Sequence, residues 1–332
     1  MTEVTATQAQ DASPAAQPTG RARTASWRKA ALLAARIVFT VAVIAAVAYT
    51  TVRQWPDVRD TLTRLAWQSV ALSLLMVVVG LGAQTLAWRA ALNDMGHRVG
   101  VRTASQIFLI GLLAKYLPGS IWSFVLQMEL GRRANLPRSR ALLASIVGFA
   151  LSSATALALG VFGLPVLFHI DVWTTVLVLT VLPIVVVCAH PRVLTWLIQR
   201  LLAATRRPRL EAPISWRGVG AVVGWCVVGW VCFGAHLWLL ANAESAPGFV
   251  GFLRCVGAFA LGLTAGQLAF LSPSGLGVRE AIIAAALLPY VPAGVALGMA
   301  LASRMVFTVG DLAAAGLAAL SGLRASRRLT GS

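Results

Sequence analysis

Charged residues are scarce in this sequence. Only 12% of the 332 residues are charged and 11 are Asp or Glu, whereas 58% are apolar. A soluble domain of this size cannot bury so much apolar surface, so the excess must face lipid. The net charge of +17 comes from arginines clustered between apolar runs, which is typical of the cytoplasmic loops of a membrane protein. We therefore expect no nucleic-acid partner.

Motifs for metal, cofactor and nucleophile chemistry are missing as well. The four cysteines lie inside apolar runs, without CxxC spacing or a neighbouring histidine, and are interpreted as small core residues. No glycine-rich nucleotide loop, zinc-binding histidine pair or nucleophile elbow occurs. The sequence therefore predicts no catalytic residues, no metal, no cofactor and a protein that is not an enzyme.

The chain divides into a tail, one membrane domain and a second, short tail. Residues 1–30 are rich in Ala, Thr, Gln, Pro and Ser without periodicity, which predicts a disordered cytoplasmic segment. Residues 31–323 are the predicted transmembrane domain, and 324–332 a short basic cytoplasmic tail. Apolar runs fall at about 32–52, 67–88, 104–127, 141–164, 173–190, 217–241, 249–271, 274–289 and 293–320. The first is as long as a full span, which favours a retained anchor over a signal peptide.

Basic residues between the runs predict the orientation of each segment, because cytoplasmic loops are enriched in Lys and Arg. Loops 89–102 and 128–140 both carry several arginines, so both are placed inside the cell. The run 104–127 between them must then enter and leave on the same face. Pro118-Gly119 breaks it as a re-entrant hairpin requires, since Pro ends a helix and Gly permits a tight turn.

The same reasoning places a second hairpin nearer the C-terminus. Segment 191–216 is basic and inside, 242–248 has no basic residue and is outside, and the final tail is inside. We favour a hairpin over 249–289, broken at 272–277 and followed by one span, although three spans would also satisfy the charge count. The predicted fold is all-α and multi-pass, with about six spanning helices and two re-entrant broken-helix hairpins. Both termini are expected in the cytoplasm, and the membrane is the inner (plasma) membrane.

The two breaks occupy matching places in an internal repeat. Pro118 precedes Pro137 by 19 residues, Pro273 precedes Pro292 by the same 19, and each second proline opens a long Ala-rich run. The charge pattern gives the two copies opposite orientations. Inverted repeats with discontinuous helices are typical of transporters whose binding site lies between the halves. The alternative is a chance coincidence in a chain with 14 Pro and 29 Gly.

Ionisable residues near the breaks are the candidate substrate-binding groups, since charges at membrane depth face the protein interior or a water-filled cavity. Lys115 and Arg279 are cations suited to a phosphate. Lys115 could instead snorkel to the interface, and Arg279 could form an ion pair with Glu280. Backbone N–H groups freed at the breaks would add anion donors. The full candidate set is Lys115, Pro118, Gly119, Arg254, Ser274, Gly275, Gly277, Arg279, Glu280, Arg304 and Asp311.

Four other features of the apolar helices predict contacts within the protein. Arg304 and Asp311 are seven residues apart and lie near one stripe of the last helix, so Asp311 needs a cation from another helix. Gln84, His236 and Gln267 are single polar residues in apolar helices, which favours hydrogen bonds between helices.

Around the breaks the sequence resembles the membrane domain of bacterial lysylphosphatidylglycerol synthase/flippase proteins and their stand-alone relatives. The matching stretches are Lys115–Trp122, with the downstream Arg132-Arg133, and Ser272–Ala281, where Ser274 replaces a more usual Gly. The resemblance covers most of residues 31–325 and implies translocation of an anionic lipid or polyprenyl-linked precursor between leaflets. In fused relatives a soluble domain transfers the amino acid. Only about ten residues follow the last predicted helix here, so that activity is expected to be absent.

The sequence thus predicts translocation of an anionic phospholipid or a polyprenyl-phosphate-linked sugar lipid. Stand-alone relatives often accompany cell-envelope glycosylation, which implies a lipid-linked glycan as substrate. One alternative is an integral-membrane glycosyltransferase with Asp57 and Asp60 as its acidic pair, although their loop is short for an acceptor site. Another is a non-transporting accessory subunit of envelope glycan assembly that holds a membrane glycosyltransferase as its partner.

Overall fold

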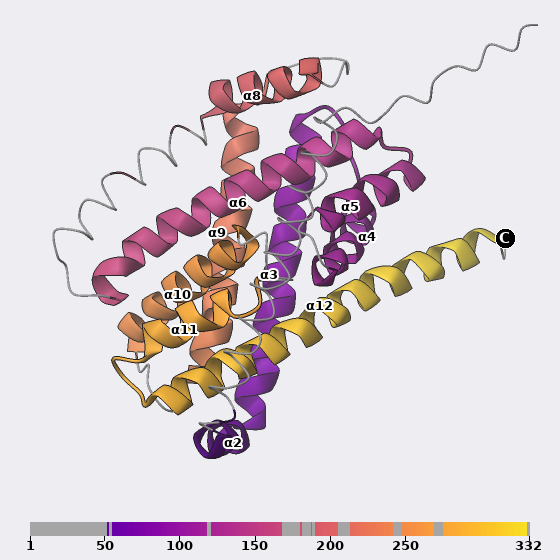
Figure 1. The fold of residues 1–332 in the computed structure, drawn as a ribbon. Helices are drawn as coiled ribbons and strands as arrows, with labels where there is room; N and C mark the ends of the chain where they lie inside the picture. The colour runs from indigo at the N-terminus through magenta and orange to yellow at the C-terminus, as the bar shows by residue number, and fades with distance from the viewer. Residues whose placement is uncertain are drawn as a thin grey trace, which may run out of the picture.

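Helices are the regular elements in the part of the chain that the computed structural model describes, namely residues 52, 55–117, 121–167, 180, 187, 190–204, 213–241, 248–268 and 275–330 (Figure 1). They are α2 (Trp55–Arg64), α3 (Trp67–Asp94), α4 (Val101–Leu112), the 3₁₀ turn η1 (Leu113–Tyr116), α5 (Trp122–Arg133), α6 (Arg138–Leu167), α8 (Pro191–Ala204), α9 (Trp216–Ala241), α10 (Gly248–Leu268), α11 (Val278–Leu287) and α12 (Ala293–Thr330). The tail 1–30 and nearly all of the predicted spans 32–52 and 173–190 lie outside the described residues.

Five of the described helices are long and apolar enough to cross a membrane, which confirms an all-α multi-pass membrane protein. They cover residues 67–94, 138–160, 216–241, 248–267 and 293–321. Four coincide with predicted spans. The fifth lies within α10, which was predicted as the first arm of the second hairpin. The 21 residues of α10 extend about 31 Å, which matches the thickness of the hydrocarbon core. Two of the six or so predicted spans, 32–52 and 173–190, lie almost entirely outside the described residues.

The antiparallel pair α3 and α9 forms the centre of the bundle. Ser73 near the start of α3 contacts His236 near the end of α9, with 2.6 Å between Oγ and Nδ1. At the other end, the backbone N–H of Ser215 donates to the Asp94 carboxylate over 2.9 Å. Gly80 faces Phe233 so closely that a methyl group on Gly80 would overlap the ring. Small residues therefore let these two helices approach closely, as is common in membrane bundles.

The first break separates two short arms. α4 and α5 have 12 residues each, about 18 Å of helix, and neither crosses a hydrocarbon core of about 30 Å alone. Gly111 of α4 packs against the Gln127 side chain of α5, so the two arms lie side by side. Pro118 and Gly119 lie outside the described residues. The helix boundaries on either side show that the predicted run 104–127 is interrupted where the sequence indicated.

The second break joins arms of unequal length. α10 and α11 pack together, and Gly266 and Gly275 meet backbone to backbone beside the turn. At the far end of the pair, the Arg254 guanidinium lies 3.5 Å from the centre of the Tyr290 ring. The start of α10 and the chain beyond α11 are therefore together, as expected of a hairpin. Its placement relative to the membrane faces remains a prediction.

Contacts between the halves follow a reciprocal pattern. α5 packs on α6 and α11 on α12, but α4 packs on α12 and α10 on α6. Thus the first arm of each hairpin contacts the long helix of the opposite half. Figure 1 shows that α6 and α12 begin at opposite ends of the bundle and run in opposite directions. This is the arrangement expected of two copies with inverted topology.

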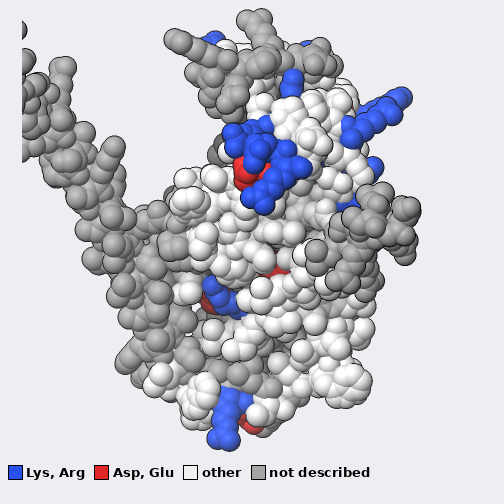
Figure 2. Space-filling model, turned by 90° about the vertical axis from the view of Figure 1, so that its right-hand side faces the viewer, with Lys and Arg blue, Asp and Glu red and all other residues white. Residues whose placement is uncertain are grey.

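Basic side chains gather at the end of the bundle where α3 ends and α9 begins. There Glu129 forms salt bridges with Arg132 and Arg138, at 2.6 and 3.0 Å. Figure 2 shows such a cluster near one end of a face that is otherwise largely uncharged. Hydrogen bonds from these guanidinium groups lower the pKa of Glu129 to about 2. Helix α8 lies across this end, burying Leu194, Ile198 and Leu202 along one stripe, as an interfacial helix does.

Candidate functional site

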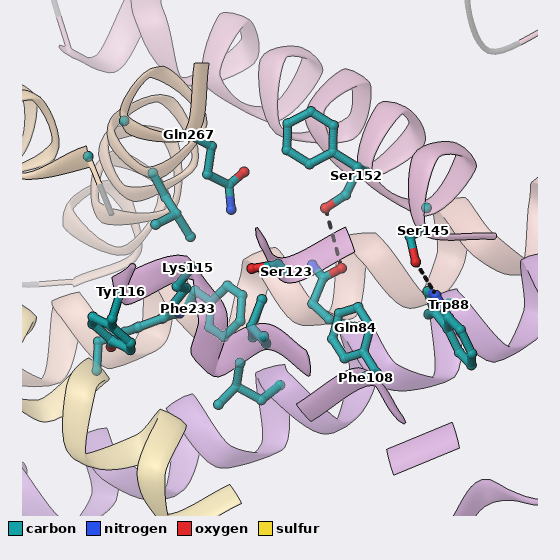
Figure 3. A pocket seen from close by; sticks show the side chains of 18 of the residues that line it. Gln84, Trp88, Phe108, Lys115, Tyr116, Ser123, Ser145, Ser152, Phe233 and Gln267 are labelled. Carbon is teal, nitrogen blue, oxygen red and sulfur yellow. Dashed lines mark hydrogen bonds between the residues drawn. The ribbon is translucent and has the colours of Figure 1, made fainter. Parts of the chain in front are cut away.

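A cavity of about 380 Å³ lies between the two halves of the bundle (Figure 3). Residues from α3, α4, η1, α5 and α6 line it together with residues from α9, α10, α11 and α12. Its wall is mainly apolar and aromatic, with basic groups in one region and neutral polar groups in another. The basic lining residues are Lys115, Arg279 and Arg304, and the neutral polar ones include Gln84, Ser123, Gln127, Ser145, Ser152 and Gln267.

Lys115, in the cavity lining, forms an ion pair with the last helix, α12. Its ammonium lies 2.5 Å from Oδ2 of Asp311 on α12, and the same oxygen accepts a hydrogen bond of 2.6 Å from the Tyr116 hydroxyl. The cation on another helix that Asp311 requires is therefore Lys115. The Lys115 ammonium also lies 5.1 Å from the centre of the Phe307 ring. Lys115 therefore points into the bundle and does not extend toward the membrane interface, as the alternative interpretation required.

Glu280 joins the second break to α12. One carboxylate oxygen accepts a bond of 2.6 Å from Arg304, and the other accepts one of 2.6 Å from the backbone N–H of Gly277. Gly277 has φ of +86°, a conformation that suits glycine, and α11 begins directly after it. The ion pair predicted between Arg279 and Glu280 is not formed. Both side chains contact α12, Glu280 at Arg304 and Arg279 at Ser303, and Arg279 also lines the cavity.

Of the three basic residues that line the cavity, Arg279 is the one that forms no ion pair with a carboxylate of the described residues. It is only 4% exposed, and its guanidinium lies 4.7 Å from the ring centres of both Phe259 and Phe307. Nη2 donates to the Ser303 hydroxyl over 3.2 Å, whereas Nε has no hydrogen-bond partner. Three cations and two carboxylates make up the cluster, so it carries one excess positive charge beside the cavity.

Ser303 also links this cluster to the centre of the bundle. Its hydroxyl lies 2.9 Å from Nε2 of His236, whose Nδ1 contacts Ser73. His236 therefore makes the predicted hydrogen bonds to other helices, to Ser73 of α3 and to Ser303 of α12. Ser303 itself gave no signal in the sequence, because a single serine in an Ala-rich helix is ordinary.

The neutral polar region joins helices of the first half. Ser152 of α6 donates to the Gln84 side chain over 3.3 Å, which confirms the interhelical bond predicted for Gln84. The indole N–H of Trp88 donates to Ser145 over 3.0 Å, and Ser145 contacts the Gln127 side-chain oxygen at 2.5 Å. Figure 3 shows the Trp88 and Ser145 end of the cavity well apart from Lys115 and Tyr116.

The structure brings most of the described candidate residues together. Lys115, Gly275, Arg279 and Arg304 line the cavity, Glu280 and Asp311 lie behind them as ion-pair partners, and Gly277 caps α11. Pro118, Gly119 and Ser274 lie outside the described residues. Arg254 is the exception, because it is absent from the cavity lining and stacks on Tyr290 at the other end of the hairpin. The described residues hold no cluster of three or more potential metal ligands.

Replacing Asp311 with Asn is expected to destabilise the protein by about 3 kcal/mol, because it leaves the Lys115 ammonium without its carboxylate in a mostly buried site. Thermal unfolding in detergent measures the effect. A double variant, Lys115→Met with Asp311→Asn, should recover much of the loss, since removing both charges leaves no unpaired ion. Equal unfolding temperatures for the Asp311→Asn single variant and the wild type would show that this pair contributes nothing.

Comparison with known proteins assigns the chain to a family. A family model described as the lysylphosphatidylglycerol synthase TM region matches residues 33–315. No curated protein sequence matches the chain. The matched range contains both helix breaks, the reciprocal hairpins and every described residue of the charged cluster. The chain therefore belongs to the family of lysylphosphatidylglycerol synthase transmembrane regions.

Proposed function

We propose that this protein translocates a lipid with an anionic headgroup between the leaflets of the membrane and is not itself an enzyme. The observation that carries the proposal is Arg279, a buried cation on the wall of the cavity between the halves, without a carboxylate partner among the described residues. An uncompensated charge at membrane depth is costly and marks a substrate path or binding site. A phosphate or similar anion would supply the missing partner.

The lining of the cavity favours an anion over a cation. Lys115, Arg279 and Arg304 all line it, whereas Asp311 and Glu280 contact two of these residues from outside the lining. A headgroup entering the cavity would therefore meet basic groups first. Guanidinium groups suit a phosphate because they offer paired donors in one plane.

The position of the cavity favours movement across the membrane over chemistry within it. Both halves line the cavity, and the first arm of each hairpin rests on the opposite half. Rocking of the halves would expose the headgroup to one leaflet and then to the other while the acyl chains stay in lipid. The acidic pair of the glycosyltransferase alternative, Asp57 and Asp60, is on α2, and Asp60 does not line the cavity.

The proposal is tested in vesicles that contain the purified protein and a headgroup-accessible fluorescent lipid. Fluorescent phosphatidylglycerol should cross faster than in protein-free vesicles, as measured by quenching from outside, and faster than fluorescent phosphatidylcholine. A fluorescent polyprenyl phosphate provides a second anionic class. Rates equal to those of empty vesicles for every anionic lipid would reject transport as the function.

A further inference from the structure

The neutral polar region of the cavity has hydrogen-bonding groups that helix packing leaves unused. The Ser123 hydroxyl is buried and has no hydrogen-bond partner, although Ser123 lines the cavity. Gln84 and Gln127 use their side-chain oxygens as acceptors, and neither amide nitrogen donates to a described residue. Gln267, also in the lining, makes no side-chain hydrogen bond within the described chain. Several donors and acceptors thus remain available to a ligand.

Aromatic rings surround these amide and hydroxyl groups. Trp88 and Phe108 lie with ring centres 6.3 Å apart on one side, and Phe124 and Phe149 form an edge-to-face pair at 5.9 Å on another. The C–H faces of a sugar or cyclitol ring pack well on aromatic surfaces, while its hydroxyls need neutral donors and acceptors. Both requirements meet in this region.

The same lining disfavours a cationic headgroup. No Asp or Glu is among the lining residues, and three basic residues are. An amine or a lysyl group would enter a low-dielectric cavity facing like charges, without a carboxylate to compensate it. The family's description therefore does not identify the headgroup that this cavity suits.

We propose that the cavity binds a neutral polyol joined to a phosphate, such as a hexose phosphate or an inositol phosphate, as the headgroup of the transported lipid. This inference rests on the proposed function and specifies its substrate class. The phosphate binds beside Arg279, and the polyol binds among Gln84, Ser123 and Gln127 of the same cavity. A cavity of about 380 Å³ lies at the small end of the range of ligand pockets, so it holds a headgroup and leaves the acyl chains in the bilayer.

The first experiment compares two pairs of fluorescent lipids, each made of a polyol phosphodiester and the phosphomonoester that lacks the polyol. Phosphatidylinositol is compared with phosphatidic acid, and a polyprenyl phosphohexose with the bare polyprenyl phosphate. In at least one pair the polyol lipid should cross about tenfold faster, because it gains two or three neutral hydrogen bonds. The pair that shows the difference identifies the lipid anchor. Lysylphosphatidylglycerol is included and should cross more slowly than the preferred polyol lipid.

Matched variants locate the effect in the cavity. Ser123→Ala and Gln127→Met should reduce the rate for the polyol lipid by a larger factor than the rate for its bare phosphate counterpart, so that the difference within the pair shrinks. Ser153→Ala is the control, because the Ser153 hydroxyl is equally buried and unpartnered but Ser153 does not line the cavity. A readout independent of transport is the unfolding temperature of the detergent-purified protein, which glucose 1-phosphate or inositol 1-phosphate should raise more than inorganic phosphate does.

The results of these experiments distinguish failure of the polyol site from failure of the proposed function. Equal rates within both lipid pairs, in a protein that still moves anionic lipids, would overturn the polyol site and leave the proposed function standing. Lysylphosphatidylglycerol crossing as fast as the polyol lipids would overturn it too. If no lipid crosses faster than in empty vesicles, both the proposed function and the polyol site fail.

Discussion

Replacing Arg279 with Gln is expected to slow the transport of anionic lipids by ten- to a hundredfold. Arg279 is buried on the cavity wall without a carboxylate partner in the described chain, so its charge has no structural pairing to lose. A hydrogen bond to a charged group contributes about 1.5–3 kcal/mol, which corresponds to this range of rates. Initial rates with fluorescent phosphatidylglycerol in vesicles measure the change.

Two comparisons separate this effect from misfolding. Arg89→Gln changes another arginine, one that donates to the Val99 carbonyl and does not line the cavity, and should retain the wild-type rate. Removing the Arg279 charge from a buried position should change the unfolding temperature little, because the desolvation cost that it removes offsets the lost bond to Ser303 and the lost contacts with the Phe259 and Phe307 rings. A wild-type transport rate in Arg279→Gln would contradict an anion site at this residue.

Replacing Gly275 with Ala is expected to destabilise the second hairpin by at least about 2 kcal/mol. Gly275 has φ of +66°, and a Cβ there would lie 2.5 Å from the Cα of Gly266. The contact is between two backbones, so no side chain can move aside to relieve it. We expect a lower unfolding temperature and slower transport together, since this turn holds Arg279 and Glu280 four and five residues later.

The matched control is Gly224→Ala. Gly224 lies in α9 with ordinary φ and nothing within 4 Å of an added methyl group, so the substitution should be neutral or slightly stabilising through helix propensity. Unfolding temperatures that are the same for Gly275→Ala and Gly224→Ala would mean that the contact between Gly266 and Gly275 does not hold the hairpin.

The sequence predicted much of the charged cluster because charges in apolar helices are rare and stand out. Lys115, Arg279, Glu280, Arg304 and Asp311 were all singled out, and the structure brings all five together. Which of these residues form ion pairs with one another was harder to predict from the sequence. Arg279 and Glu280 are neighbours in sequence, yet Glu280 pairs with Arg304 on α12 while Arg279 bonds Ser303 of the same helix.

The neutral part of the cavity could not be predicted as a site. Gln84, Gln127 and Ser145 come from three helices, and serine hydroxyls in helices commonly bond their own backbone, as that of Ser145 does to the Ala141 carbonyl. Nothing in their spacing shows that they meet. Arg254 is the opposite case: its charge made it a candidate in the sequence, but it does not line the cavity and stacks on Tyr290 at the far end of the hairpin.

The reciprocal packing of the hairpins has a mechanical consequence. Because α4 packs on α12 and α10 packs on α6, outward movement of either hairpin would either break its contacts with the long helix of the other copy or carry that helix with it. Under the proposed function, the two halves would therefore move as coupled units and not as separate hairpins.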